Sequence, residues 1–377
     1  MLSITGDNGT RLAAIIPTLI KYLGVDLSEA APKRVDPQLK SAIVLVVDGL
    51  GWHNLFARSG HARTLTKMKS EKIQTVVPST TAAALATLTT GVLPGQHGLT
   101  GYRILHPQFG VISALSEWDQ IEDVREWQLH KTLFEVANDF DISSHVVARK
   151  SHSDTGFTRA VLGGTKYWGV DSLEQRFDTA LEIAGKNPAS LTYLYVDELD
   201  RAGHKYGWKS NQWIEQLERV DSATERLLQK LSEKMGFVLT ADHGMVDIDA
   251  DRYQVVEEIP QLKDKIIHIS GEPRFRHIYL KSAKQADEIA QSLSATQNDL
   301  QVSTRDQVIA SKLFGEVHQK VHQRIGDLVI TPNRLISLAT QQDPIFPVSM
   351  IGQHGGVTSE ERDVPILVSG KMEDLSF

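Results

Sequence analysis

Ser41-Ala-Ile-Val-Leu-Val-Val-Asp48-Gly49 is the segment from which the fold class can be inferred. Its apolar residues follow one another without polar interruption, and several of them are β-branched. A strand of this kind is buried on both faces, as in parallel sheets that are covered by helices on both sides. The segment therefore predicts a central strand of an α/β sheet, with Asp48 at its carboxyl end.

Further apolar runs of the same kind follow and alternate with segments of helical period. The expected strands cover residues 73–77, 144–148, 191–196 and 236–240, and the expected helices cover residues 81–89, 131–139, 173–184 and 210–234. Strands that alternate with helices are typical of a doubly wound, mostly parallel sheet with helices on both faces. We take this as the predicted fold class.

The pattern changes after residue 250. Short apolar segments at 276–280 and 327–331 and a helical segment at 284–293 predict a small α+β cap. We expect this cap to occupy residues 251–331, inserted into a core formed by residues 1–250 and 332–377. Within the cap, Arg274–His277 is interpreted as solvated surface.

Composition limits the function classes. The 377 residues are 41% hydrophobic and 23% charged, with a formal charge of −7, which is ordinary for a globular protein and argues against non-specific nucleic-acid binding. Cysteine is absent, so thiolate ligands and a cysteine nucleophile are excluded. No apolar run is long enough to span a membrane, and residues 12–25 make a poor signal peptide, so we expect a cytoplasmic protein.

Acidic and histidine residues gather where the expected strands end. Each of them alone has an ordinary explanation as a helix cap, a surface pair or a loop residue. Together, three aspartates and three histidines form a nitrogen and oxygen ligand set for two divalent metals, which suits zinc best, with manganese or iron as alternatives. The six are Asp48, Asp200, His204, Asp242, His243 and His354, and Asp197 is a rival for Asp200.

Hydroxyl residues lie where residues 73–77 lead into an alanine-rich helix. Ser79, Thr80 and Thr81 follow Pro78, and Gly91 closes the helical segment. A helix start offers free N–H groups and partial positive charge, which favour a phosphate or an alkoxide. One hydroxyl of the three can cap the helix while another reacts.

These motifs, in this order, resemble the alkaline phosphatase superfamily, and within it the nucleotide pyrophosphatase/phosphodiesterase family. The resemblance extends over residues 43–356, from the strand before Asp48 to His354-Gly355. It implies two zinc ions, one held by Asp200, His204 and His354. The other would be held by Asp48, Asp242 and His243, with the oxygen of Thr81 as an additional ligand.

The resemblance also implies a reaction. Thr81 would attack phosphorus and form a covalent phospho-threonine intermediate, so that phosphodiester or pyrophosphate bonds of a small molecule are hydrolysed. The resemblance also implies an asparagine at position 84 that binds a phosphate oxygen, and this chain has Ala84 there. A phosphonoacetate-hydrolase-like enzyme, a phosphomonoesterase and a non-catalytic binding homologue therefore stay open. No prediction of the oligomeric state follows from the sequence.

Several other residues have two interpretations. His97 is interpreted as structural, and Tyr102 and Trp168 as core aromatics rather than stacking partners of a substrate. The polar stretch Lys150–Thr158 is interpreted as a surface loop, with a wall of the pocket as the alternative.

Overall fold

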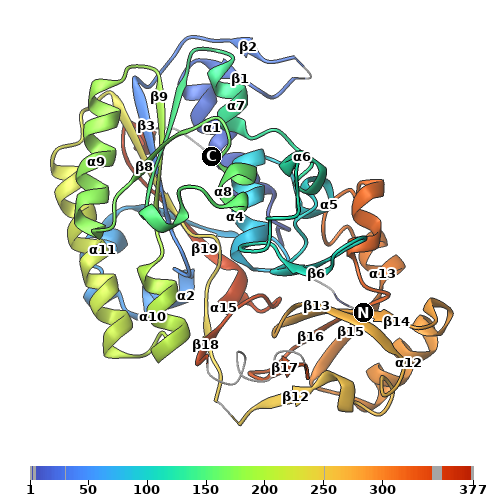
Figure 1. Cartoon of the computed structure of the whole chain (residues 1–377). Helices are drawn as coiled ribbons and strands as arrows, with labels where there is room; N and C mark the ends of the chain where they lie inside the picture. Colours follow the sequence, from blue (N-terminus) through green and yellow to red (C-terminus); the bar gives the residue numbers. More distant parts are fainter. Residues whose placement is uncertain (1, 3–5, 30, 250, 342–349, 375–377) are drawn as a thin grey trace.

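The structure is a computed structural model that describes residues 2, 6–29, 31–249, 251–341 and 350–374. Its centre is a seven-stranded sheet (Figure 1). In spatial order the strands are β4 (Lys69–Gln74), β19 (Asp363–Gly370), β10 (Met235–Thr240), β3 (Ser41–Val47), β9 (Ser190–Val196), β7 (Ser143–Ala148) and β8 (Lys166–Gly169).

Most of this sheet is parallel. The run from β10 through β3, β9 and β7 to β8 is parallel throughout, whereas β19 pairs antiparallel with both β10 and β4. Figure 1 shows α9 (Leu173–Lys186) and α11 (Asn211–Gln229) on one side of the sheet, and α1 (Thr10–Tyr22), α4 (Thr81–Thr90) and α7 (Leu133–Asn138) on the other. The predicted fold class is confirmed.

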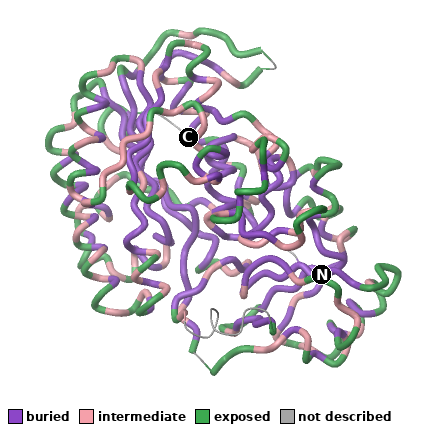
Figure 2. The backbone as a smooth tube through the Cα atoms, viewed as in Figure 1, coloured by how far each residue is buried: buried purple, intermediate pink, exposed green. Residues whose placement is uncertain are grey.

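Strand β3 lies at the middle of the sheet because every one of its side chains is apolar or small. All seven of its residues are buried, and Leu45 is flanked in register by Leu239 of β10 and Leu194 of β9. The purple tubes in Figure 2 show the same burial continuing through the neighbouring strands. This buried frame fixes the positions of the residues that follow each strand.

The expected strand over residues 73–77 is misplaced. Strand β4 occupies Lys69–Gln74 at the edge of the sheet, and its first four residues are exposed. An edge strand faces solvent and is commonly charged, so it lacks the apolar signal on which the prediction relied. The buried Val76 and Val77 lie just beyond it, where the chain turns toward α4.

A second, smaller sheet is formed by the part of the sequence between β12 (Tyr253–Val255) and β17 (Ser337–Ala339), two strands that pair with each other. It is antiparallel, in the order β13 (Ile266–Glu272), β14 (Phe275–Leu280), β16 (Leu328–Pro332) and β15 (Leu300–Thr304). Helix α12 (Ala286–Thr296) covers it, and a separate apolar cluster that includes Ile278, Leu293 and Leu328 fills the space between. We call this region the cap; a domain boundary at residues 251 and 331 stays a prediction.

The interpretation of Arg274–His277 as solvated surface is wrong. Arg274, Arg276 and His277 are all buried. The Arg274 guanidinium forms two parallel hydrogen bonds of 3.0 and 2.9 Å with the carboxylate of Glu361 on α15 (Ser359–Arg362), and also donates to the carbonyls of Arg334 and Ile336. Its charge is thus paired, as a buried charge must be, and the pair joins the cap to the main sheet.

Within the part of the chain that the structure describes, none of the helices is both long and apolar enough to cross a bilayer.

Candidate active site and metal centre

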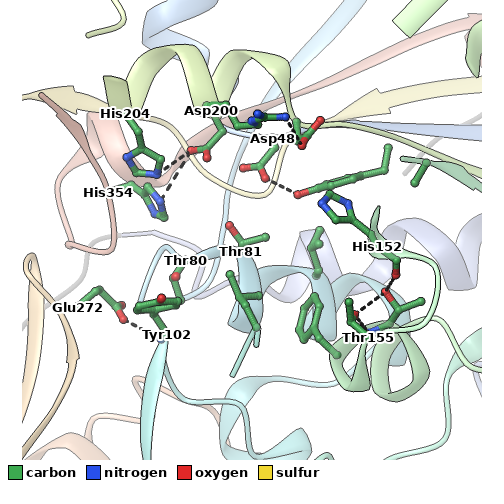
Figure 3. A pocket seen from close by; sticks show the side chains of 18 of the residues that line it. Asp48, Thr80, Thr81, Tyr102, His152, Thr155, Asp200, His204, Glu272 and His354 are labelled. Atoms are coloured by element: carbon green, nitrogen blue, oxygen red, sulfur yellow. Dashed lines mark hydrogen bonds and ion pairs between the residues drawn. The ribbon is translucent and has the colours of Figure 1, made fainter. Parts of the chain in front are cut away.

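The six predicted ligand residues come together at the carboxyl ends of three adjacent strands. Asp48 follows β3 and Asp242 lies just past β10, while Asp200 and His204 lie on α10 (Glu198–Tyr206), which follows β9. Adjacent parallel strands end at the same edge of a sheet, where open α/β folds place their functional groups. His354 reaches the same point from the turn after β18 (Gly352–Gln353), as Figure 3 shows.

Two overlapping groups of ligand atoms are compact enough to hold a metal ion. In the first, Asp48, Asp242 and His243 have ligand atoms that all lie within 4.8 Å of one another. His243 Nε2 lies 3.2 Å from Asp48 Oδ1 and 3.5 Å from Asp242 Oδ2. This is the set that the resemblance implies for one ion.

The second compact group differs from the implied set. It contains Asp200, His354 and His243, so His243 is shared by both groups. The imidazole rings of His243 and His354 stack with their centroids 3.5 Å apart, which explains the sharing. His204 lies outside this group, although its Nε2 is 3.2 Å from Asp200 Oδ1. The division of the ligands between two ions therefore stays a prediction.

All three histidines present the same nitrogen to the site. Nδ1 of His204 donates to the Gly352 carbonyl at 2.7 Å, Nδ1 of His354 to the Ser79 carbonyl at 2.9 Å, and Nδ1 of His243 to the Gly244 carbonyl at 3.1 Å. A backbone carbonyl only accepts, so each Nδ1 must carry a proton, and each Nε2, once it is deprotonated, can offer its electron pair to a metal ion. Metal-binding histidines are oriented in this way by their outer hydrogen bonds.

The carboxylates are crowded in a buried space, and their pKa values respond to this. Burial and the charge of Asp48 raise the pKa of Asp242 to about 7, and the same two causes raise that of Asp200 well above its usual range. Burial opposes the charge of Asp48, but the positive charge of His243 and the hydrogen bond from Tyr195 outweigh burial and hold the pKa of Asp48 below its usual range. Burial lowers the pKa of His243, but the surrounding aspartates raise it to about 10.

Several oxygens in this group are unsatisfied. Oδ1 of Asp48, Oδ1 of Asp200 and Oδ2 of Asp242 are buried without a hydrogen-bond donor among the described residues. Buried polar atoms without partners are costly, and three carboxylates this close repel one another. Divalent cations would compensate for both, so the donor set fits the metal centre that the resemblance implies.

Thr81 is the first residue of α4, and its Oγ1 lies 3.2 Å from His243 Nε2. The helical hydrogen bonds begin with Ala84 N–H donating to Thr80 O, so the N–H groups of Thr81, Ala82 and Ala83 lie outside the helical ladder. Thr80 is the N-cap residue, and the Ser79 hydroxyl donates to the Gly356 carbonyl, which holds the turn that carries His354. Of the three hydroxyls, that of Thr81 thus contacts the metal centre.

The expectation for position 84 is wrong. Ala84 is fully buried in the apolar core beneath α4, whereas Thr80, Thr81 and Leu85 of that segment line the cavity. An asparagine at position 84 would point into the core and not toward a phosphate. Ala84 therefore says nothing about the choice between diester and other substrates.

Asp197, the rival of Asp200, is already paired. Its Oδ1 accepts from Arg149 Nε at 2.6 Å, and Arg176 and Arg201 lie 3.8 Å from its oxygens. Asp200, in contrast, faces His204 and His354. The geometry therefore favours Asp200 as the ligand.

A cavity of about 420 Å³ opens beside the metal centre. Of the interpretations based on sequence, that of Tyr102 as a core aromatic and that of Lys150–Thr158 as a surface loop are wrong, because both contribute to the cavity wall. Trp168 instead packs against the main core, and His97 is buried with Nε2 3.0 Å from Thr87 Oγ1, as a structural histidine would be. Besides ligand residues, the wall includes Leu85, Tyr102, Leu115, His152, Thr155, Phe157, Thr158, Leu162, Tyr167, Tyr193, Tyr195, Arg201 and Glu272.

Of the wall residues that the sequence analysis did not single out, Tyr195 and Glu272 are the most informative. The hydroxyl of Tyr195 donates to Asp48 Oδ2, and Glu272 reaches the cavity from the cap. In the sequence Tyr195 is one of several residues of an apolar strand, so nothing marks it as functional. Glu272 is far along the sequence from most of the ligand residues. Only the fold brings them together.

Known proteins with similar sequences include phosphodiesterases. A 96-residue stretch is 33% identical to venom phosphodiesterase 2 of Crotalus adamanteus, covering 24% of this chain and 12% of that protein. A longer stretch of 237 residues is 22% identical to human ectonucleotide pyrophosphatase/phosphodiesterase family member 1, covering 56% of this chain and 24% of that protein. The matches thus span less than a quarter of the length of each of these relatives.

Solved structures share the fold. Murine ectonucleotide pyrophosphatase/phosphodiesterase 5 superposes with a TM-score of 0.67 at 19% identity, covering 86% of this chain and 87% of that one. Phosphonoacetate hydrolase from Sinorhizobium meliloti 1021, solved with phosphonoacetate, gives a TM-score of 0.69 at 19% identity, with 89% and 91% covered. The model of the type I phosphodiesterase/nucleotide pyrophosphatase family matches residues 42–356, and the chain therefore belongs to that family.

Proposed function

We propose that this chain is a two-zinc hydrolase that cleaves phosphodiester or pyrophosphate bonds of small molecules through a phospho-threonine at Thr81. The observation that carries the proposal is the contact between the Thr81 hydroxyl and the shared ligand His243, 3.2 Å apart, at the start of α4. This contact supports Thr81 as the nucleophile, because His243 belongs to both groups of candidate ligands. A cytoplasmic location stays a prediction from the sequence.

The reaction consists of two displacements at phosphorus. Thr81 Oγ1 forms a bond to phosphorus while the ester or anhydride oxygen leaves with its electron pair, and water later cleaves the phospho-threonine and restores the hydroxyl. Bound divalent cations would lower the pKa of the hydroxyl and offset the negative charge that develops on oxygen.

The chain itself supplies positioning. The N–H group of Thr81, a residue that lines the cavity, lies outside the helical ladder at the start of α4, where the helix dipole favours the negative charge of a phosphate. The three Nδ1–carbonyl hydrogen bonds hold the imidazoles in fixed orientations, so the donor atoms need no reorganisation.

The cavity wall favours an apolar or aromatic ester group over a carboxylated one. Leu115, Phe157, Leu162 and Tyr167 form an apolar part of the wall. Phe157 is two residues from Thr155, which lies on the far side of Thr81 from Glu272 in Figure 3. Among the described lining residues Arg201 is the only arginine, it lies 3.8 Å from Asp197, and no lysine is present. A phosphonate with a carboxylate beside the phosphorus would find little positive charge here.

The test compares hydrolysis of bis-p-nitrophenyl phosphate with that of p-nitrophenyl phosphate and phosphonoacetate by zinc-loaded protein. We expect the diester to be preferred, and activity to disappear after treatment with EDTA. Thr81→Ala should lose activity by at least about a thousandfold, since the attacking atom is removed. Thr81→Ser keeps a hydroxyl and should retain part of the rate.

Thr80→Ala is the matched control for the nucleophile, because it removes a neighbouring cavity hydroxyl that does not contact the metal centre. A larger loss in Thr80→Ala than in Thr81→Ala would reject Thr81 as nucleophile. Preference for the monoester or for phosphonoacetate would reject the diesterase assignment. Stoichiometric zinc binding without turnover of any of the three would favour a binding homologue.

A further inference from the structure

Glu272 is a cap residue that reaches the metal centre. It ends β13, at the hairpin that leads into β14, and its side chain lines the cavity beside Tyr102 and Thr80 (Figure 3). In the same view His152 and Thr155 lie on the opposite side of Thr81. The cavity therefore has two ends, one largely apolar and one with a carboxyl group.

The carboxyl group is held in a fixed position by two close backbone approaches. A Cβ atom at Gly355 would lie 2.4 Å from Glu272 Cγ, and one at Gly101 would lie 3.3 Å from Glu272 Oε2. The N–H of Tyr102 donates to Oε2 at 2.8 Å. Because Gly355 directly follows His354, the glycine that gives Glu272 its space belongs to the turn that carries a candidate ligand.

The second oxygen is left without a partner. Glu272 is only 4% exposed, and its Oε1 has no hydrogen-bond donor among the described residues. Its hairpin neighbour Arg274 is engaged with Glu361, and Arg276 Nε donates to the Leu338 carbonyl. A buried carboxyl with one satisfied oxygen is costly unless a ligand completes it. In agreement, burial raises the pKa of Glu272 to about 8.

We propose that Glu272 Oε1 receives an ammonium group of the substrate, so that this end of the cavity selects phosphodiesters in which one ester group carries a primary amine. The inference rests on the proposed function, because it assumes that a phosphodiester lies at Thr81. A neutral group with one N–H or O–H would fill the hydrogen bond, but only a cation would also stabilise the ionised form of Glu272, which burial disfavours.

Charge supports this assignment. A phosphodiester brings one negative charge to Thr81, and a carboxylate nearby would repel it. An ammonium group between the phosphodiester and the Glu272 carboxylate would attract both anions, whereas an apolar ester group at the same place would leave Glu272 Oε1 unpaired. Glu272 would then weaken the binding of substrates with a second phosphate charge on the cap side.

The test uses two esters that differ in one group. Phenyl 2-aminoethyl phosphate and phenyl propyl phosphate have nearly the same shape, and only the first carries an ammonium. Their dissociation constants are measured by calorimetry with zinc-loaded Thr81→Ala protein, which does not consume them. We expect the amine to bind about tenfold more tightly, in line with a charge-assisted hydrogen bond, and Glu272→Gln in the same background to bring the ratio close to one.

Glu258→Gln is the matched control, since Glu258 is an exposed carboxyl of the cap, and it should keep the ratio. Equal affinity for both esters in the protein with Glu272 intact would overturn the proposal without any further variant. A preference that survives Glu272→Gln would also overturn it. Failure of the proposed function is detected separately, because it would appear as absence of bis-p-nitrophenyl phosphate hydrolysis by the wild-type protein.

Discussion

Thr81 Oγ1 lies 3.2 Å from His243 Nε2, which connects the start of α4 to the end of β10. His243 belongs to both compact ligand groups, so a single contact relates the candidate nucleophile to the whole metal centre. The contact depends on two local facts. The chain turns at residues 75–80 so that α4 begins at Thr81, and β10 ends two residues before Asp242.

Replacing Asp200 should remove metal stabilisation, and replacing Asp197 should not. A ligand at a hundred times its dissociation constant stabilises the folded state by about 2.7 kcal/mol, so zinc should raise the thermal midpoint of EDTA-treated wild-type protein by several degrees. We expect Asp200→Asn to lose most of this shift in a thermal scan. Asp197→Asn should keep the shift but start from a lower midpoint, because Arg149 loses one of its two carboxylate partners and keeps only Glu198. The opposite pattern would make Asp197 the ligand.

The metal-free protein should lose stability as the pH rises. Asp242, with its pKa raised to about 7, holds a proton in the folded state that the unfolded chain releases near pH 4. His243, raised to about 10, does the same above its ordinary value of 6.5. The folded state thus binds more protons, and the free energy of unfolding falls by up to about 1.4 kcal/mol per pH unit and proton.

Urea unfolding of EDTA-treated protein between pH 5 and 9 measures this slope. The Asp242→Asn variant has no titratable side chain at this position, so its free energy of unfolding should change less with pH below pH 7. Zinc should make the free energy of unfolding change less over the whole range, because the metal replaces the protons held by Asp242 and His243. A metal-free profile that rises with pH over this range would contradict the crowding of the carboxylates.

The sequence was sufficient to predict what lies within single elements. The uninterrupted apolar run of β3 predicted a central strand, and the residues after β3, β9 and β10 predicted the ligands, because a parallel sheet places strand ends together. The helix start singled out Ser79, Thr80 and Thr81 together, and only the family resemblance selected Thr81 among them. The contents of each strand and its following loop carry this information.

Relationships between distant segments escaped prediction. The burial of Arg274 depends on Glu361, 87 residues away, and a charged segment cannot reveal that its partner is buried with it. The cavity wall formed by the loop around Thr155 and by Glu272 depends on how cap and core pack. Position 84 was misjudged because the rotation of α4 about its axis sets which residues face the core, and sequence order alone does not fix that rotation.

The pair between Arg274 and Glu361 should be a major support of the joint between cap and core. Both side chains are fully buried, and Glu361 also accepts from the Gly356 N–H beside the His354 turn. Glu361→Gln leaves the Arg274 charge without its counter-ion, so we expect the free energy of unfolding to fall by about 3–5 kcal/mol in urea titrations.

Glu360→Gln is the control, because Glu360 is exposed and adjacent, and it should change stability by less than about 0.5 kcal/mol. The contribution of this pair to stability depends on pH through the pKa of Glu361. Burial opposes the charge of Glu361, but Arg274 lowers its pKa below the ordinary value. The pair therefore stabilises above about pH 4.5, and this contribution is lost as the pH falls further. Equal stability of the two variants would show that the pair is not needed.

Tyr195 should strengthen metal binding without being a ligand. Its hydroxyl donates to Asp48 Oδ2 and leaves Oδ1 toward His243, so it fixes the orientation of this carboxylate. Loss of such an outer hydrogen bond typically costs 10- to 100-fold in metal affinity. We expect Tyr195→Phe to weaken zinc binding by about tenfold in competition with a chromophoric chelator.

Tyr193→Phe is the matched control, because the neighbouring Tyr193 hydroxyl is buried without a partner among the described residues. Removing it deletes no hydrogen bond to a ligand, and zinc affinity should stay within about twofold of wild type. If the two variants weakened binding equally, the effect would come from the cavity wall in general, and the hydrogen bond to Asp48 would have no special role.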